Sequence, residues 1–219
     1  IKARPGFNDG GKNYAINPVG TYHRSFDLPQ GWDKQRTIIH FGGIYSCAQV
    51  WLNGKYVGYT QGSNNVAEFD LTHLLRAGKN DLVVQVHRWC DGSYLECQDM
   101  FRENGIFRDV LLYELPKTYI NDYYLRTSKK AGTYSLSADI AVQGNTVGYT
   151  VEITATDKEG KVLFSNEAPA NEQMNFENLY VVEWNAEIPT LYEVFITLKK
   201  EGTPVHSLRS YLGFKNVKI

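Results

Sequence analysis

The 219-residue sequence has almost no net charge, because its 23 basic residues are nearly matched by 24 acidic ones. A net charge of −1 gives no electrostatic reason to bind nucleic acid or an anionic membrane surface. The sequence also contains no apolar run long enough to cross a bilayer. We therefore expect no nucleic-acid partner and no membrane partner, and a neutral ligand fits this chain better.

Cysteine is scarce as well, with only Cys47, Cys90 and Cys97 in the chain. An odd number of cysteines does not describe a disulfide framework, and these three lack the spacing of a metal site. Cys90 and Cys97 could pair across the segment between them, although free cysteines more often act as small buried apolar groups. The histidines also lack ligand spacing, which favours structural roles. They are His23, His40, His73, His87 and His206.

The sequence opens at Ile1 without an initiator methionine or the apolar core of a signal peptide. This beginning is typical of a segment taken from a longer protein, so we expect more chain upstream. Localisation stays open between the cytoplasm and the periplasm.

Helical periodicity is also missing, because no stretch keeps a 3.6-residue apolar repeat long enough for a substantial helix. The sequence has instead short alternating runs bounded by turn residues, which is the pattern of β-strands. Asn53-Gly54 is the strongest turn signal, because a type I′ hairpin turn needs positive φ at both positions. We also expect the Thr72 hydroxyl to cap a short turn through Leu75. In the first half, strands are expected at 21–28, 37–41, 48–52, 55–59, 67–71, 82–87 and 106–113.

Beyond Lys117 the pattern changes to plain alternating strands separated by turn signals at short spacing. Seven short strands of this kind are typical of an immunoglobulin-like β-sandwich. The fold class is therefore all-β, with one domain over residues 1–117 and a second over 118–219. The second-half strands are expected at 122–126, 134–142, 149–155, 161–165, 179–182, 192–198 and 206–212.

The segment 88–110 is unlike the other connections, because it is long and interleaves aromatic rings with charges. Long loops without secondary structure are usually either functional or disordered. Disorder is the weaker alternative here, since the segment carries too much apolar surface to remain in water. Its aromatic and large apolar residues are Trp89, Tyr94, Leu95, Met100, Phe101, Ile106 and Phe107.

Four stretches, in order along the chain, carry a family resemblance: NPVGTYHRSF, WLNGKYVGYTQGS, EFDLTHLLRAGKNDLVVQVHRW and DGSYLECQDMFRENGIFRDV. Together they resemble the sugar-binding domain of family 2 glycoside hydrolases, and within that family the β-galactosidases. The sequence departs from the family pattern at Cys97, Phe101 and Glu103-Asn104, which puts fine substrate preference in doubt more than family membership.

The resemblance implies a jelly-roll, galactose-binding-like sandwich over 1–117, followed by the immunoglobulin-like sandwich. It also implies that the chain is the non-catalytic N-terminal portion of a retaining β-galactosidase that hydrolyses terminal β-D-galactosides. In the family both catalytic glutamates lie in a downstream (β/α)₈ barrel, and this sequence has no alternating strand and helix pattern of that kind. The expected partners are a galactoside substrate and that barrel, which also holds magnesium, in a parent protein that forms homo-oligomers.

Asp91 is the residue that the resemblance singles out. In the β-galactosidases the Asp that opens this motif contacts the galactose 6-hydroxyl and a bound sodium ion, which implies both substrate binding and metal binding for Asp91. A carboxylate suits both tasks, as a hydrogen-bond acceptor and as a hard oxygen ligand. From the residues alone, Asp91-Gly92 could equally start a turn after a strand.

Glu96 and Asp99 are candidate catalytic groups, because glycoside hydrolysis normally needs two carboxyl groups facing each other across the scissile bond. Their more common role in a folded loop is to pair with arginines, here Arg88, Arg102 or Arg108. We therefore expect no catalytic residue in this chain, and no hydrolysis by the chain alone.

An alternative is an independent carbohydrate-binding module that holds glycans without cutting them. Trp51 and Trp89, if exposed, could form a platform on which a sugar stacks. Each also lies within a strand pattern that explains it as packing, which is the favoured interpretation.

Overall fold

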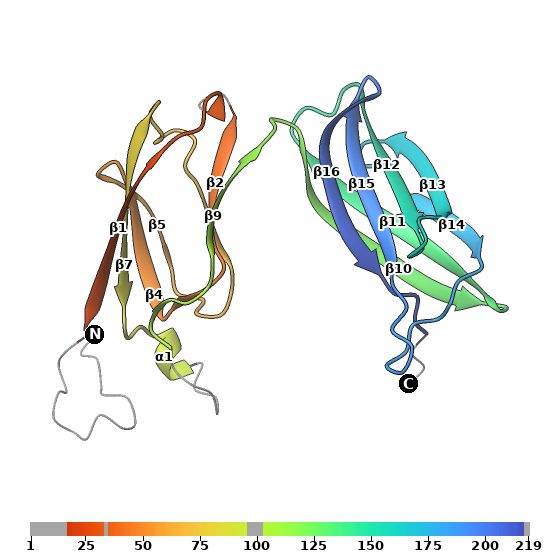
Figure 1. Cartoon of the computed structure of the whole chain (residues 1–219), viewed down its shortest axis with the longest axis horizontal. Coiled ribbons are helices and arrows are strands. Elements are labelled where there is room, and N and C mark those ends of the chain that lie inside the picture. The colour runs from red at the N-terminus through yellow and green to blue at the C-terminus, as the bar shows by residue number, and fades with distance from the viewer. Residues whose placement is uncertain (1–16, 33–34, 96–102, 217–219) are drawn as a thin grey trace. The chain divides into compact units, whose positions relative to one another are not determined.

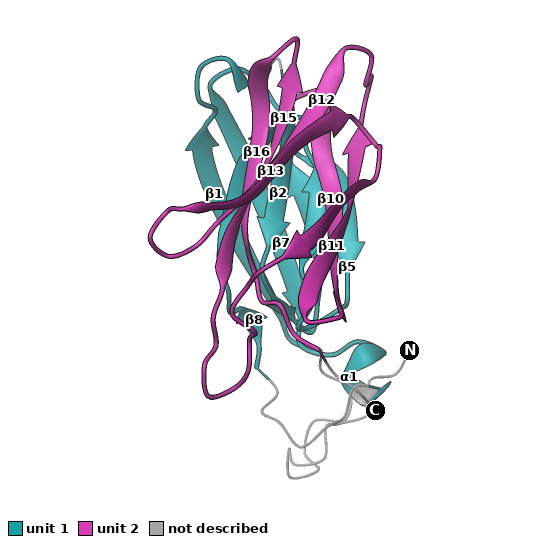
Figure 2. Cartoon of the chain, turned by 90° about the vertical axis from the view of Figure 1, so that its right-hand side faces the viewer, with its two compact units in different colours: residues 1–115 teal, residues 116–219 magenta. Residues whose placement is uncertain are grey.

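The structure is a computed structural model that describes residues 17–32, 35–95 and 103–216. The chain divides into two compact units, Ile1–Leu115 and Pro116–Ile219, coloured separately in Figure 2. The predicted all-β class is confirmed, because each described unit is built from antiparallel sheets. The one α-helix in the described ranges is α1 (Gly92–Leu95), and no helix there is long and apolar enough to cross a membrane.

Unit 1 contains two main sheets and a short ladder (Figure 1). The larger sheet has the order β1-β7-β4-β5, and the smaller has the order β6-β2-β9. The ladder joins β3 to β8. The strands are β1 (Val19–Asp27), β2 (Arg36–Phe41), β3 (Ile44–Tyr45), β4 (Cys47–Leu52), β5 (Lys55–Thr60), β6 (Ala67–Asp70), β7 (Lys79–His87), β8 (Gly105–Ile106) and β9 (Val110–Leu115).

The core of unit 1 lies between the two main sheets and is made by alternate residues of their strands. On β7 the buried apolar residues are Leu82, Val84 and Val86, which confirms the predicted alternation. They pack in one cluster with Val50 of β4 and Phe41 of β2, both fully buried. Each such side chain contributes roughly 1.5–3 kcal/mol of transfer free energy when it leaves water. This core fixes the position of the end of β7, and Asp91 follows that end by four residues.

The predicted hairpin at Asn53-Gly54 is confirmed, with φ of 53° and 78° between β4 and β5. The Asn53 side chain also donates to Leu74 O at 2.9 Å and to Asn80 Oδ1 at 2.8 Å. Its own oxygen accepts from the backbone N–H of Asp81 at 3.0 Å. Asn80 is fully buried, so the pair satisfies polar groups that would otherwise be costly in the interior.

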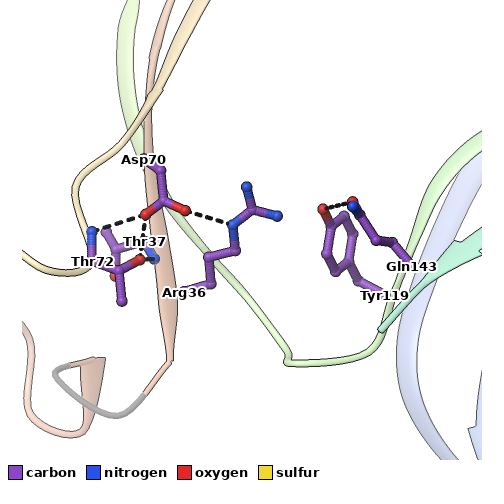
Figure 3. Close-up of polar contacts among 6 residues, drawn as sticks. All are labelled: Arg36, Thr37, Asp70, Thr72, Tyr119 and Gln143. Atoms are coloured by element: carbon purple, nitrogen blue, oxygen red, sulfur yellow. Dashed lines mark hydrogen bonds and ion pairs between the residues drawn. The ribbon is translucent and has the colours of Figure 1, made fainter. Parts of the chain in front are cut away.

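Two local expectations for unit 1 were wrong. Thr72 does not cap the turn that follows it. Its hydroxyl accepts from Thr37 N at 3.0 Å and bonds Asp70, which also accepts from Arg36 Nε at 2.7 Å (Figure 3). The predicted strand at 106–113 is two strands, β8 and β9, because Arg108 between them donates to carbonyls elsewhere in the chain.

In the described part of the chain, β1 is an edge strand that pairs with β7 and is exposed along most of its length, with Tyr22 45% exposed. Near its end Phe26 packs against the core cluster, and Leu28 directly after it is buried.

Unit 2 is a sandwich of a three-stranded sheet, β10-β11-β14, and a four-stranded sheet, β13-β12-β15-β16. Alternate residues from both sheets enter one core cluster, with Leu136, Ile153 and Ile196 at 1% exposure or less. The strand expected at 179–182 lies earlier in the chain, as β14, which ends at Leu179. The strands are β10 (Tyr119–Lys130), β11 (Thr133–Gln143), β12 (Tyr149–Thr156), β13 (Val162–Pro169), β14 (Met174–Leu179), β15 (Tyr192–Lys200) and β16 (Thr203–Leu212).

Candidate functional site at the end of strand β7

Asp91 lies four residues beyond the end of β7 and immediately before α1 (Figure 1). Its side chain is exposed, whereas Gly92 and Ser93, which follow it, are buried. The chain therefore turns inward directly after presenting a carboxylate to solvent.

The approach to Asp91 is clamped by the residues just before β1, the neighbouring strand, whose first residue pairs with the last residue of β7. The Asn17 side chain donates from Nδ2 to Trp89 O and accepts at Oδ1 from Trp89 N, both at 2.9 Å. One residue earlier, Arg88 N donates to Pro18 O at 3.0 Å. A side-chain amide that meets both backbone groups of one residue replaces a neighbouring strand. The backbone is therefore held in an extended path beyond the last pair of the β1–β7 ladder, Val19 and His87.

The turn itself is held by Ser93. Cys90 N donates to Ser93 Oγ at 3.1 Å, and Ser93 N donates back to Cys90 O at 3.1 Å. Leu95 N donates to Asp91 O at 3.2 Å, which closes the single turn of α1. Ser93 is 1% exposed and these bonds satisfy it, so they fix the backbone on both sides of Asp91.

Two thiols and a phenol lie beside this turn. Burial raises the pKa of the Cys47 thiol, and burial together with Cys47, Cys90 and Asp91 raises the pKa of the Tyr59 hydroxyl above its usual range. Both groups are therefore neutral at pH 7. Asp91 is one of the groups that raise the pKa of Tyr59, so its carboxylate lies within electrostatic reach of that hydroxyl.

Several predicted site residues lie outside the described residues: Cys97, Phe101, Glu96, Asp99 and Arg102. The suggested Cys90–Cys97 pairing and the pairing of Glu96 and Asp99 with arginines thus stay predictions. Of the arginines proposed as their partners, Arg108 donates to Gly42 O at 3.1 Å and to Asn64 O at 3.0 Å. The Arg88 guanidinium lies 5.1 Å from the centre of the Trp89 ring.

The tryptophans proposed as a stacking platform are both half-buried. Trp51 meets Tyr56 edge to face at a centroid distance of 5.6 Å. Tyr56 itself is 56% exposed, so this end of the β4–β5 hairpin offers aromatic surface to solvent. Packing therefore explains only part of the environment of the tryptophans, because Trp51 also lies beside an exposed ring.

In the described parts of the chain, no three His, Cys, Asp or Glu side chains are close enough to hold a metal ion between them. A hard cation held at Asp91 would need its remaining ligands from outside the described residues. An exposed, positioned carboxylate fits such a shared site.

Sequence reasoning missed the clamp made by Asn17. This residue begins one of the quoted motifs, but the motif gave it no structural role. Its partner Trp89 is 72 residues away, and local patterns do not show contacts at that separation. The Pro that follows Asn17 gave a signal for an extended backbone, without indicating what the side chain would bind.

The fold and this site define a tandem β-sandwich chain whose first unit presents a positioned carboxylate at the end of a sheet. Two family models match nearly all of it. The model for the sugar binding domain of glycosyl hydrolases family 2 matches residues 7–116, and a second glycosyl hydrolases family 2 model matches residues 118–215. The chain therefore belongs to glycosyl hydrolase family 2, as the resemblance predicted.

Curated relatives of the chain are glycosidases. It is 35% identical over 214 residues to a β-galactosidase of Clostridium acetobutylicum, covering 93% of this chain and 23% of the relative. It is 36% identical over 220 residues to a β-galactosidase of Priestia megaterium, covering 93% and 21%. The chain thus spans less than a quarter of the length of these curated relatives.

A solved structure supports the fold. The β-glucuronidase of Bifidobacterium dentium, complexed with coumarin-3-O-glucuronide, matches with a TM-score of 0.78 at 25% identity. The match covers 90% of this chain and 39% of that one.

Proposed function

We propose that this chain is the non-catalytic N-terminal portion of a retaining β-galactosidase that hydrolyses terminal β-D-galactosides, and that it supplies one wall of the active-site pocket. The two β-galactosidase relatives support the substrate class, because each aligns with 93% of this chain. The observation that carries the proposal is the exposed Asp91 carboxylate on a backbone fixed by Asn17 and Ser93. Preorganised groups bind a ligand without the cost of ordering them first.

Asp91 is proposed to accept a hydrogen bond from a galactose hydroxyl and to give one oxygen to a sodium ion. The other sodium ligands would come from the catalytic barrel of the same parent chain, which would also hold magnesium. The cation, when bound, supplies a fixed positive charge that orients sugar oxygens. The role of this chain is to hold one carboxylate where the sugar arrives.

Bond cleavage is assigned to the barrel rather than to this chain. A retaining glycosidase needs two carboxyl groups about 5–5.5 Å apart. The family resemblance assigns both of these groups to the barrel, and this chain spans less than a quarter of the length of its curated relatives. The galactoside and the barrel are thus the proposed partners, within a homo-oligomeric parent.

The second candidate, an independent carbohydrate-binding module, is favoured by the exposed rings of the hairpin. Tyr56 is 56% exposed and Tyr59 is 46% exposed, with Trp51 against Tyr56. Rings exposed in this way can stack on the C–H faces of a sugar. A module of this kind would bind its glycan without the barrel.

Titration of the isolated chain with lactose separates the two candidates. The indole N–H signals of Trp51 and Trp89 report on unit 1, and hydrolysis is followed in the same sample. The half-site predicts no saturable shift at either indole and no glucose release. A saturable shift in the millimolar range or below would support the module, and release of glucose would overturn both candidates.

A further inference from the structure

Unit 2 has a hollow on the solvent side of the β10-β11-β14 sheet. The three strands of this sheet are labelled in Figure 1. Its volume is about 320 Å³, which is within the range of small-molecule sites in proteins. The opposite side of the same sheet carries core residues such as Leu136 and Ile140. The hollow therefore lies within unit 2 and is separate from the Asp91 site.

The strand register explains why the hollow forms. Tyr124 of β10 is paired with Asp139 of β11, and Asp122 is paired with Ala141. Side chains on alternate residues of a strand share a face, so Tyr124, Asp139 and Ala141 lie on the same side of the sheet. Ala141 is the small residue of the set, and its methyl group leaves space between the longer side chains around it. A break in the ladder between Ile120 and Asp122 shifts the strand at one end of this space.

The polar walls of the hollow are anchored. Asn171 accepts from Val142 N at 2.7 Å and donates to Val142 O at 3.3 Å, so its side chain is fixed beside β11. Gln173 Nε2 donates to Asp139 Oδ1 at 2.6 Å. Asp122 Oδ1 accepts from Tyr123 N at 2.8 Å. These bonds use only part of each group's capacity, because a carboxylate accepts about four hydrogen bonds and an amide also has both donors and acceptors.

The aromatic wall is Tyr124, which is 62% exposed. The Arg126 guanidinium lies 5.2 Å from the ring centre and forms an ion pair with Asp139. The charge of Asp139 is therefore largely compensated, which makes the hollow polar without making it strongly anionic. The described residues place no third metal-ligating side chain beside Asp122 and Asp139, so a multivalent cation is a poor match.

We propose that this hollow is a second saccharide-binding subsite, outside the pocket assigned above, that takes one neutral hexose unit. The Tyr124 ring is the stacking platform, while Asp122, Asn171 and Gln173 exchange hydrogen bonds with hydroxyl groups. A neutral polyol uses both features, since it has C–H faces for a ring and hydroxyls that donate and accept. Such a subsite would let unit 2 hold a further sugar of an oligosaccharide or glycan.

The test is a titration of the ¹⁵N-labelled chain with galactose, glucose and lactose, followed at the Ala141 backbone amide and the Gln173 side-chain amide. The proposal predicts saturable shifts at both positions with at least one of the sugars. Tyr124→Ala should weaken binding by about fivefold, because an aromatic contact contributes on the order of 1 kcal/mol beyond its area. Ala141→Leu fills the hollow and leaves Tyr124 in place. This variant should abolish the sugar-induced shifts.

Tyr211→Ala is the matched control, because Tyr211 is also exposed (55%) and lies under an arginine, with Arg209 at 5.3 Å from its ring. This variant should bind as the unchanged chain does. The proposal is overturned if none of the three sugars gives a saturable shift, or if Tyr124→Ala and Tyr211→Ala bind alike. If calcium shifts the signals of the same amides and no sugar does, the hollow is a cation site and the saccharide proposal is overturned. Because all signals come from unit 2, failure here leaves the assignment of Asp91 untouched.

Discussion

Removal of the Asn17 side chain should release the backbone that leads to Asp91. In Asn17→Ala the Trp89 N–H and C=O both lose partners at 2.9 Å. Each such bond contributes about 0.5–1.5 kcal/mol net, so the two together stabilise the clamped path by roughly 1–3 kcal/mol. At about 1.4 kcal/mol for each factor of ten, local opening at Trp89 should become about fivefold to 140-fold more frequent.

Amide hydrogen exchange measures this opening directly. Protection of the Trp89 amide should fall by about this factor, whereas Val84 amide protection, in the middle of β7, should be unchanged. Asn17→Asp keeps an oxygen for the Trp89 N–H and loses only the donor, so its effect should be smaller. The reasoning is refuted if Asn17→Ala leaves Trp89 protection unchanged, or if Trp89 and Val84 lose protection equally through global unfolding.

Three further changes test the two units. Leu52→Ala should destabilise unit 1 by about 2–5 kcal/mol in denaturant unfolding, because the side chain is fully buried and a cavity would remain; a loss below about 1 kcal/mol would contradict this packing. Gly105→Ala should also destabilise unit 1, since φ is 91° and a Cβ would lie 2.5 Å from the Tyr22 hydroxyl, and Tyr22→Phe should restore part of the loss. Burial lowers the pKa of His206, whose ring accepts from Ile120 N at 3.1 Å, so the folded state binds fewer protons than the unfolded state just below the ordinary pKa of 6.5. The thermal midpoint of unit 2 should therefore fall as the pH drops through that window, and His206→Gln, if folded, should flatten the dependence; an equal slope in both would remove His206 as its source.

Much of the fold could be predicted because strand alternation and turn chemistry are local. The pattern at 82–87 and the Asn53-Gly54 turn each reappear in the structure with the expected face or φ. The errors arose where a distant contact decides the path. Arg108 binds the carbonyls of Gly42 and Asn64 and interrupts a strand that looked continuous, and Thr72 bonds Thr37 rather than its own turn.

The candidate site shows the same division. Asp91 could be named from a motif, and its exposure is what a ligand-binding carboxylate requires. The two side chains that fix its backbone had to come from the structure, because Asn17 acts across 72 residues and Ser93 acts through a buried hydroxyl. The hollow beside Tyr124 was also invisible in the sequence, since it depends on the small Ala141 lying between strands.

The most direct measurement of the central claim is the kinetics of the full-length parent carrying Asp91→Ala, across a range of sodium concentrations. Loss of a hydrogen bond to a charged group costs about 1.5–3 kcal/mol, so the KM for a chromogenic galactoside should rise by about tenfold to a hundredfold, and the sodium dependence should weaken. Asp109→Ala, which changes an exposed carboxylate in the same 88–110 segment, is the matched control and should leave both unchanged. An unaltered KM for Asp91→Ala at every sodium concentration would contradict the assignment of Asp91 to the sugar pocket.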